Sequence, residues 1–310
     1  MYTFSMVPVD AQARVLRNVH LSADYNVLAL EAPAIAASTR PGQFVMIRTA
    51  AGTDPLLRRP FSVFEVLREA DATPSAISVL CKRIGPGTSL LYGAAVGDCL
   101  SVLGPLGTPF TPVGPPAEAW MVAGGVGLAP FATLAEALRD LGTPARLFYG
   151  GRSATDLFYL DWFEARGVGC DLATEDGTRG AHGRVTVPLA AALRAQPPDR
   201  PVTLYACGPE AMLKAVAGLA SAHGRPSQIS TERIMGCGLG GCYSCVVGVR
   251  DESGTPRFVR SCLNGPVFNG DSLVWESGPV SEGGLLCVCS DRPEEPVGKQ
   301  SVATLFSDRL

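Results

Sequence analysis

Four cysteines near the C-terminal end have the spacing of iron–sulfur ligands. Cys237, Cys242 and Cys245 form a C-x4-C-x2-C loop, and Cys262 follows after sixteen intervening residues. This is the ligand order of plant-type [2Fe–2S] proteins, in which four thiolates hold two irons. Three of the four residues between the first two cysteines are glycine, which lets the chain curl around a cluster with positive φ angles. Structural zinc and unpaired core cysteines are the alternatives, but zinc usually takes two short paired spacings.

A second motif carries groups suited to a flavin at the start of a predicted strand. Arg59 offers positive charge for a pyrophosphate, Phe61 a contact for the ring system, and Ser62 a hydrogen bond. Taken alone, the motif is better explained as a basic turn that enters a strand.

A later segment strengthens the case for a flavin. Residues 80–89 run from a strand into a turn that contains two glycines and two hydroxyl side chains. The backbone amides of Gly87 and Thr88 are suited to hold a phosphate. The two segments together favour a flavin site in the N-terminal part of the chain.

A glycine-rich turn in the middle of the chain predicts a dinucleotide site. Gly124, Gly125 and Gly127 connect a strand to a helix, where backbone amides favour an anion and missing side chains let a nucleotide approach. The turn is not the G-x-G-x-x-G fingerprint, because Pro130 occupies its last position. An ordinary tight turn between strand and helix is the alternative.

A second strand-to-helix turn, Cys207-Gly208-Pro209, repeats this arrangement. Both turns are expected at the carboxyl edge of a parallel sheet, where ligands bind in open α/β folds. Cys207 has an alternative interpretation as a small buried hydrophobic residue. Glu175 and Asp176 follow another strand, where a carboxylate either contacts a ribose or lies in a solvated turn.

The pattern of apolar residues predicts the elements that position these motifs. Up to residue 112, six short strands bounded by Gly, Pro, Asp and Ser indicate a small antiparallel barrel. After residue 117, strands alternate with helices, which is typical of a parallel sheet covered on both faces. The strands are expected at 14–20, 26–31, 43–49, 61–66, 77–84, 99–103, 119–123, 146–149, 169–173 and 202–206. The helices are expected at 128–141, capped by Gly142, and from Pro209 to Gly224.

Composition narrows the class of protein. The 310 residues are 46% hydrophobic and 18% charged, with a net charge of −3, which argues against a nucleic-acid partner. The first six residues lack the basic start and apolar core of a signal peptide, so we expect a cytoplasmic protein. The longest uncharged apolar stretch, 119–135, is too short for a bilayer and is interrupted by glycines, so no membrane contact is expected. The three histidines form no constellation, and we expect no catalytic residue.

These motifs together resemble the ferredoxin–NADP reductase superfamily. The cysteine loop, followed by Gly265-Pro266-Val267-Phe268, further resembles the electron-transfer subunits of bacterial NAD-dependent (class 1B) dihydroorotate dehydrogenases. The resemblance covers about residues 10 to 270. It implies a multi-domain fold, with an FAD-binding antiparallel β-barrel, an α/β parallel-sheet nucleotide domain and a small C-terminal [2Fe–2S] domain. The predicted boundaries are 1–112, 113–228 and 229–280, with a C-terminal extension at 281–310.

The resemblance also implies the residues of each site. Those that contact FAD are Arg59, Pro60, Phe61, Ser62, Leu80, Cys81, Lys82, Gly87 and Thr88. Those near NAD are Gly124, Gly125, Gly127, Cys207, Gly208 and Pro209, and the cluster ligands are Cys237, Cys242, Cys245 and Cys262. Arg152 would suit NADP, yet an arginine there also simply covers a strand end, and only the family favours NAD.

The function implied by the resemblance is electron transfer between NAD and a partner. A flavin exchanges both hydride and single electrons, and therefore connects nicotinamide to a one-electron cluster. The partner would be an FMN-containing dihydroorotate dehydrogenase catalytic subunit, in a heterotetramer that forms orotate for pyrimidine biosynthesis. The alternatives are a reductase subunit of a hydrogenase or of a ferredoxin-linked NAD(P)H bifurcating complex, and a flavin-based redox sensor without turnover.

Apolar residues around the cysteines predict a surface for this partner. We expect Leu239, Tyr243 and Leu263, with Val267 and Phe268, to gather around the cluster. Some of them must pack beneath it, but a loop this short cannot bury them all. The role of the extension, including Cys287 and Cys289, is not predicted.

Overall fold

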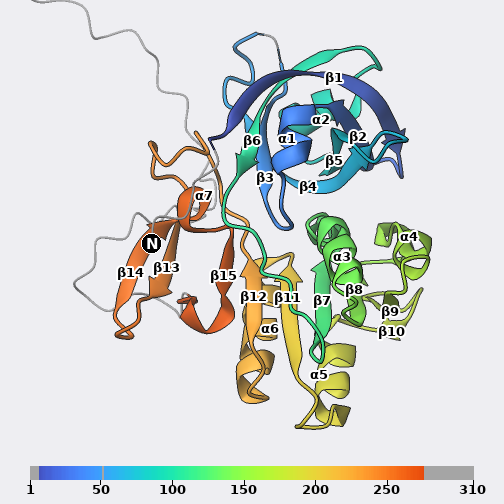
Figure 1. Cartoon of the computed structure of the whole chain (residues 1–310), viewed down its shortest axis with the longest axis vertical. Helices are drawn as coiled ribbons and strands as arrows, with labels where there is room; N and C mark the ends of the chain where they lie inside the picture. Colours follow the sequence, from blue (N-terminus) through green and yellow to red (C-terminus); the bar gives the residue numbers. More distant parts are fainter. Residues whose placement is uncertain (1–6, 51, 276–310) are drawn as a thin grey trace, which may run out of the picture. The chain divides into compact units, whose positions relative to one another are not determined.

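The computed structural model describes residues 7–50 and 52–275 (Figure 1). Its N-terminal part is a closed antiparallel barrel with the strand order β1-β2-β5-β4-β3-β6, which confirms the predicted barrel of six strands. Alternate residues of these strands point inward, and Val15, Leu28, Val45 and Val79 belong to one buried core. The strands are β1 (Val9–His20), β2 (Tyr25–Glu31), β3 (Phe44–Arg48), β4 (Arg59–Arg68), β5 (Pro74–Lys82) and β6 (Cys99–Leu106).

Two short helices accompany the barrel, and sequence analysis assigned neither of them. They are α1 (Pro33–Ser38) and α2 (Pro86–Tyr92), and each has a proline in its first turn. Proline fits this position because its missing N–H has no helical partner there. The predicted turn with Gly87 and Thr88 is therefore the first turn of α2, directly after β5.

The second part is a seven-stranded sheet with the order β10-β9-β8-β7-β11-β12-β15. All pairs are parallel except that of β12 with β15, as Figure 1 shows at one edge of the sheet. The strands are β7 (Glu118–Gly124), β8 (Ala145–Gly151), β9 (Gly169–Thr174), β10 (Ala181–His182), β11 (Val202–Cys207), β12 (Ser227–Ser230) and β15 (Val267–Asn269). The helices are α3 (Phe131–Asp140), α4 (Leu160–Glu164), α5 (Thr186–Ala195) and α6 (Glu210–Ala222).

Helices cover both faces of this sheet, as predicted. Met121 of β7 packs in one core with Phe131 of α3, whereas its neighbour Trp120 packs in the other core with Leu189 of α5 and Leu213 of α6. Successive residues of one strand thus face opposite layers. The first predicted helix begins three residues late, at Phe131, because residues 125–128 form a 3-10 turn.

The cysteine segment is joined to the sheet. After the loop, β13 (Val246–Arg250) and β14 (Pro256–Arg260) form a hairpin, and α7 (Ser261–Asn264) leads into β15. Phe268 of β15 lies opposite Ile229 of β12, so this segment adds the last strand of the nucleotide sheet. The barrel, sheet and cysteine segment share one compact unit that ends at Trp275. The domain boundaries at 112 and 228 stay a prediction, and the segment 281–310 lies outside the described residues.

In the part of the chain that the structure describes, no helix combines the length and the apolar character needed to cross a membrane.

Candidate functional site

A cavity of about 440 Å³ lies where the barrel meets the sheet and the segment after β12. We call it the barrel-side cavity. Seven of the residues predicted to contact FAD line it, namely Arg59, Pro60, Phe61, Ser62, Leu80, Lys82 and Thr88. The sheet side contributes Val126, Ala129, Cys207 and Ser230, and the segment after β12 contributes residues 231–235. The mixture of apolar walls with a few polar groups is typical of a cofactor site.

The strand period explains which residues of β5 reach this cavity. Leu80 and Lys82 line it, whereas Cys81 between them is fully buried in the barrel core. Burial raises the pKa of the Cys81 thiol to about 12. A contact between FAD and Cys81 therefore involves its backbone, because the side chain points into the barrel.

The predicted phosphate residues meet beside Arg59. A Cβ at position 87 would lie 3.3 Å from Thr49 Oγ1 and 3.5 Å from Arg59 Nε, so glycine lets the guanidinium approach the start of α2. The Thr88 hydroxyl accepts hydrogen bonds from the amides of Ile84 and Gly85 and closes the turn. These contacts bring Arg59 close to Gly87 and Thr88, the two residues predicted to hold a phosphate. Gly87 contributes because it has no side chain to keep the guanidinium away.

Thr49 was not found by sequence analysis. It is 5% exposed, and its hydroxyl has no hydrogen-bond partner among the described residues. A buried hydroxyl without a partner is costly, and one beside an arginine and a helix start fits a phosphate oxygen. No sequence signal identified it, because a threonine at the end of a strand is common.

A second cavity of about 590 Å³ opens along the carboxyl edge of the sheet. We call it the sheet-side cavity. Its lining includes four of the residues predicted to lie near NAD, namely Gly124, Gly125, Gly208 and Pro209. A Cβ at Gly124 would lie 2.8 Å from Pro209 Cδ and 2.9 Å from Met212 Sδ. The absence of side chains thus brings the two strand-to-helix turns into contact, and this cradle fits an elongated nucleotide.

The other two residues predicted to lie near NAD, Gly127 and Cys207, do not line the sheet-side cavity. Gly127 is absent from the lining of either cavity, and a Cβ there would collide with the carbonyl oxygen of Cys207. Glycine at this position allows the two strand-to-helix turns to pack against each other. Cys207 lines the barrel-side cavity and is 3% exposed, and burial raises the pKa of its thiol well above the usual range.

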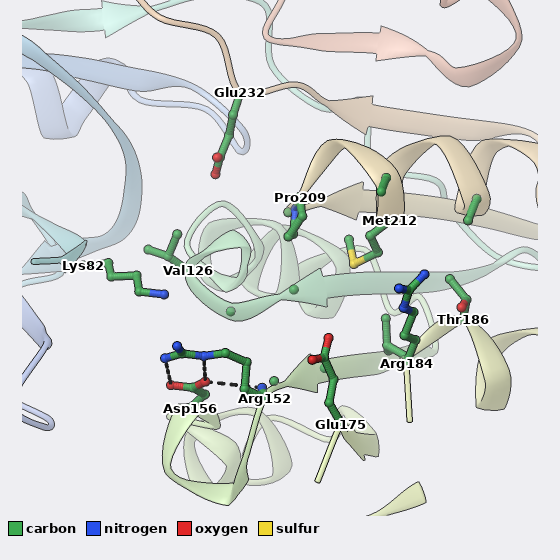
Figure 2. Close-up of a pocket in the computed structure, with 18 of the residues that line it drawn as sticks. Lys82, Val126, Arg152, Asp156, Glu175, Arg184, Thr186, Pro209, Met212 and Glu232 are labelled. Atoms are coloured by element: carbon green, nitrogen blue, oxygen red, sulfur yellow. Dashed lines mark hydrogen bonds and ion pairs between the residues drawn. The ribbon is translucent and has the colours of Figure 1, made fainter. Parts of the chain in front are cut away.

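Charged side chains occupy the sheet-side cavity (Figure 2). Arg152 Nε lies 2.9 Å from Asp156 Oδ2, and the Asp156 side chain is 10% exposed. Glu175 lines the same cavity, as sequence analysis allowed for a ribose contact. In Figure 2, Lys82 lies at the left of the view, Glu232 at the top and Arg184 at the right.

The two cavities share a wall formed by Lys82, Ile84, Val126 and Glu232. A ligand in one cavity is therefore next to a ligand in the other. Sequence analysis missed Glu232, which stands in the segment after β12. Its side chain is exposed to the space inside the cavities, yet the protein around it excludes enough water for desolvation to raise the pKa of the carboxyl.

The four predicted cluster ligands lie close to one another in two pairs. The hydroxyl and amide of Ser244, and then Cys237, lower the pKa of the Cys242 thiol to about 6. Burial, and then a hydrogen bond with Cys245, raise the pKa of the Cys262 thiol to about 12. Among the described residues, no three His, Cys, Asp or Glu side chains surround a single ion position. A [2Fe–2S] cluster divides four thiolates between two irons, and two pairs of cysteines fit that donor set.

The loop is shaped by residues with positive φ. Gly238 (71°), Gly240 (82°) and Tyr243 (57°) have left-handed backbone conformations, as predicted for the glycines. The amide of Leu239 donates to Cys237 Sγ at 3.3 Å, as expected of a loop whose amides face sulfur. Arg260 donates to the carbonyl of Gly240 and lies 4.6 Å from the centroid of the Tyr243 ring.

The cysteine loop packs directly on the barrel. Cys245 and Cys262 share a buried cluster with Phe44 and Met235, two residues that also line the barrel-side cavity. A Cβ at Gly238 would lie 2.6 Å from Met46 Cγ of β3. Only a few side chains therefore separate the barrel-side cavity from the cluster ligands.

The structure corrects the predicted apolar surface around the cluster. Leu239, Tyr243 and Leu263 are 55%, 61% and 47% exposed, as expected. Val267 and Phe268 are 7% and 8% exposed because β15 pairs with β12, so these two are the members of the set that are buried, and they pack in the sheet and not beneath the cluster. Cys287 and Cys289 lie outside the described residues.

The closed barrel, the sheet with its nucleotide turns and the cysteine loop define a reductase of the ferredoxin–NADP reductase class. Residues 121–218 match the oxidoreductase NAD-binding domain, and residues 232–274 match the iron–sulfur cluster binding domain of dihydroorotate dehydrogenase B. The chain belongs to the family of electron transfer subunits of dihydroorotate dehydrogenase B, which confirms the family predicted from the sequence.

Two relatives show the extent of this similarity. The dihydroorotate dehydrogenase B (NAD(+)) electron transfer subunit of Geobacillus kaustophilus is 38% identical over 76% of this chain and 87% of its own length. That of Desulforamulus reducens is 33% identical over 85% of this chain and 98% of its own length.

Solved structures agree on the fold. The NADH-dependent reduced ferredoxin–NADP oxidoreductase superimposes with a TM-score of 0.73 and 28% identity, over 86% of this chain and 90% of that one. A ferredoxin NADP+ reductase from Neisseria gonorrhoeae, solved with FAD and NADP, has a TM-score of 0.57 over 69% of this chain and 92% of its own. At 18% identity the second shares only the fold.

Proposed function

We propose that this chain carries electrons between the FMN of a partner dehydrogenase and NAD(H), through a [2Fe–2S] cluster and FAD. One observation carries the proposal, namely that the three sites adjoin. Lys82 and Glu232 belong to both cavities, and Phe44 and Met235 connect the barrel-side cavity to Cys245 and Cys262. Electron transfer requires such short separations between carriers.

The residues of this chain bind and orient, and no acid or base is assigned to them. Bound FAD supplies the exchange between hydride and single electrons that nicotinamide and the cluster cannot make with each other. Arg59 and the start of α2 would hold its pyrophosphate, with Thr49 Oγ1 within reach of a phosphate oxygen. Gly124 and Pro209 would hold the nicotinamide nucleotide against the shared wall.

The reaction proposed for the whole enzyme is oxidation of dihydroorotate to orotate in pyrimidine biosynthesis. The substrate would react on an FMN-containing catalytic subunit, joined with this chain in a heterotetramer in the cytoplasm. The name of the relatives supports this assignment, because they are the electron transfer subunits of dihydroorotate dehydrogenase B (NAD(+)).

NAD is the favoured nucleotide. The guanidinium of Arg152 is engaged by Asp156, and Glu175 adds a further negative charge to the same cavity. Carboxylates favour a ribose hydroxyl over a 2′-phosphate, which needs basic partners.

Titration of the purified protein with NADH tests the function. NADH is expected to bleach the flavin absorbance near ~450 nm, and a one-electron acceptor should then support steady oxidation of NADH. A flavin-loaded protein that NADH cannot reduce would contradict the proposal and favour the redox sensor.

A bifurcating reductase subunit is the second candidate, because the NADH-dependent reduced ferredoxin–NADP oxidoreductase has the same fold over most of the chain. The identity of the partner protein distinguishes the two candidate functions. Dihydroorotate should reduce this chain's cluster only in the presence of a dihydroorotate-oxidising subunit, whereas reduced ferredoxin should do so in a bifurcating complex.

The apolar surface around the cluster is the proposed contact with the catalytic subunit. Three large apolar side chains are exposed there, on the cysteine loop and on α7, and with their exposed fractions they are Leu239 (55%), Tyr243 (61%) and Leu263 (47%). A surface of this kind is typical of a protein–protein interface.

Leu239→Glu is expected to weaken the complex with the catalytic subunit by about tenfold or more, because it places a charge in the apolar centre of the interface. Size-exclusion chromatography and calorimetry of the two subunits measure this. Val187→Glu is the matched control, since Val187 is 59% exposed on α5, away from the cysteine segment. Equal affinity for both variants would contradict the assigned surface.

A further inference from the structure

We propose that Glu232 makes the site select the oxidised nicotinamide, so that NAD+ binds more tightly than NADH. The inference rests on the proposed function and adds a specificity-determining residue to it. Glu232 is the one carboxyl-bearing side chain that lines both cavities among the described residues. It also lies near enough to Cys207 to affect that thiol electrostatically.

The backbone around Glu232 is fixed on both sides. The amide of Thr231 donates to the carbonyl of Pro266 at 2.9 Å. Arg233 Nη1 donates to Glu210 Oε2 at 2.6 Å, which ties the next residue to the start of α6. These contacts position the backbone at Glu232 so that its side chain lines the wall that the two cavities share.

The Glu232 carboxyl has no cationic partner among the described side chains. Within residues 7–50 and 52–275, no hydrogen bond or ion pair to its side chain is found, and desolvation raises its pKa. Of the nearby cations, Arg233 pairs with Glu210 and Arg152 pairs with Asp156. Lys82 of the shared wall lies with its Nζ 5.3 Å from the centroid of the Tyr25 ring and forms no ion pair with Glu232 among the described residues. A cationic ligand would therefore gain from a carboxylate that has no ion-pair partner among the described residues.

The oxidised and reduced nicotinamide rings differ in charge. The ring of NAD+ carries a positive charge, and hydride addition at C4 cancels it to give the neutral ring of NADH. A carboxylate beside the ring attracts the first form and is almost indifferent to the second. Glu232 would thus hold the hydride acceptor before reaction and release the product after it, which suits transfer toward NAD+.

Equilibrium binding to the FAD-loaded protein tests this without turnover. The ligands are NAD+ and 1,4,5,6-tetrahydro-NAD, a neutral analogue that cannot donate a hydride, and calorimetry gives both Kd values. In Glu232→Gln we expect the Kd of NAD+ to rise about tenfold and that of the analogue to stay within about twofold. Glu232→Asp, which keeps the charge, should restore the preference for NAD+.

Glu175→Gln is the matched control, because it makes the same change of charge elsewhere in the sheet-side cavity. It should alter the two Kd values by the same factor. An equal change for both ligands in Glu232→Gln, or no change, would overturn the selective role while leaving the proposed function intact. A wild-type protein that binds neither ligand would overturn both. The flavin absorbance of each variant verifies that the FAD site is preserved.

Discussion

Cys242→Ser is expected to abolish the [2Fe–2S] cluster and to leave FAD bound. Cys242 is exposed at the outer side of the loop, and serine offers a far poorer ligand than a thiolate for iron. No residue of the loop from 237 to 245 lines the barrel-side cavity, so the flavin contacts stay in place. Iron and flavin contents, with the visible spectrum, measure both effects in one sample.

Cys99→Ser provides the control for this substitution. Cys99 is also exposed, but it stands on β6 of the barrel, and its loss should change neither iron nor flavin. Simultaneous loss of both cofactors in Cys242→Ser would show that the cluster maintains the wall of the barrel-side cavity. Gly238 of the loop lies against Met46 of β3, so a change in the loop could reach the barrel through this contact.

Arg59→Ala is expected to raise the Kd of FAD about 10- to 150-fold, which corresponds to a charge-assisted hydrogen bond of about 1.5–3 kcal/mol. Among the residues that the structure describes, Arg59 donates only to the carbonyls of Leu57 and Arg58, so little of the fold depends on it. Fluorescence titration of the apoprotein gives the Kd. The Tm of the flavin-free protein should change little.

The neighbouring arginine is the control. Arg58 donates to Asp10 and to Ser101 and does not line the barrel-side cavity. Arg58→Ala should leave the affinity for FAD unchanged, although it removes the same charge from the adjacent position. If both variants bind FAD like the wild type, the motif at Arg59 is only a basic turn that enters β4.

Much of this protein was predictable because its signals are local. The cysteine spacing records how one loop wraps around a cluster, and the glycines at 238 and 240 have the left-handed φ values that the sequence required. Short apolar runs bounded by Gly, Pro, Asp and Ser predicted the barrel strands, and the apolar period of α6 was apparent between Pro209 and Gly224. Such patterns depend on neighbours in the chain, and they are therefore visible before folding.

The tertiary structure alone decided which residues meet. Val267 and Phe268 follow the cluster ligands in the sequence, but pairing with β12 buries them in the nucleotide sheet. Gly127 makes room for Cys207, which comes eighty residues later, and so no local pattern could reveal its role. Glu232 has no motif of its own, and its position between the two cavities follows only from barrel and sheet packing together. Sequence determines the chemistry that each loop can perform, whereas the packing of distant segments determines which loops act on the same ligand.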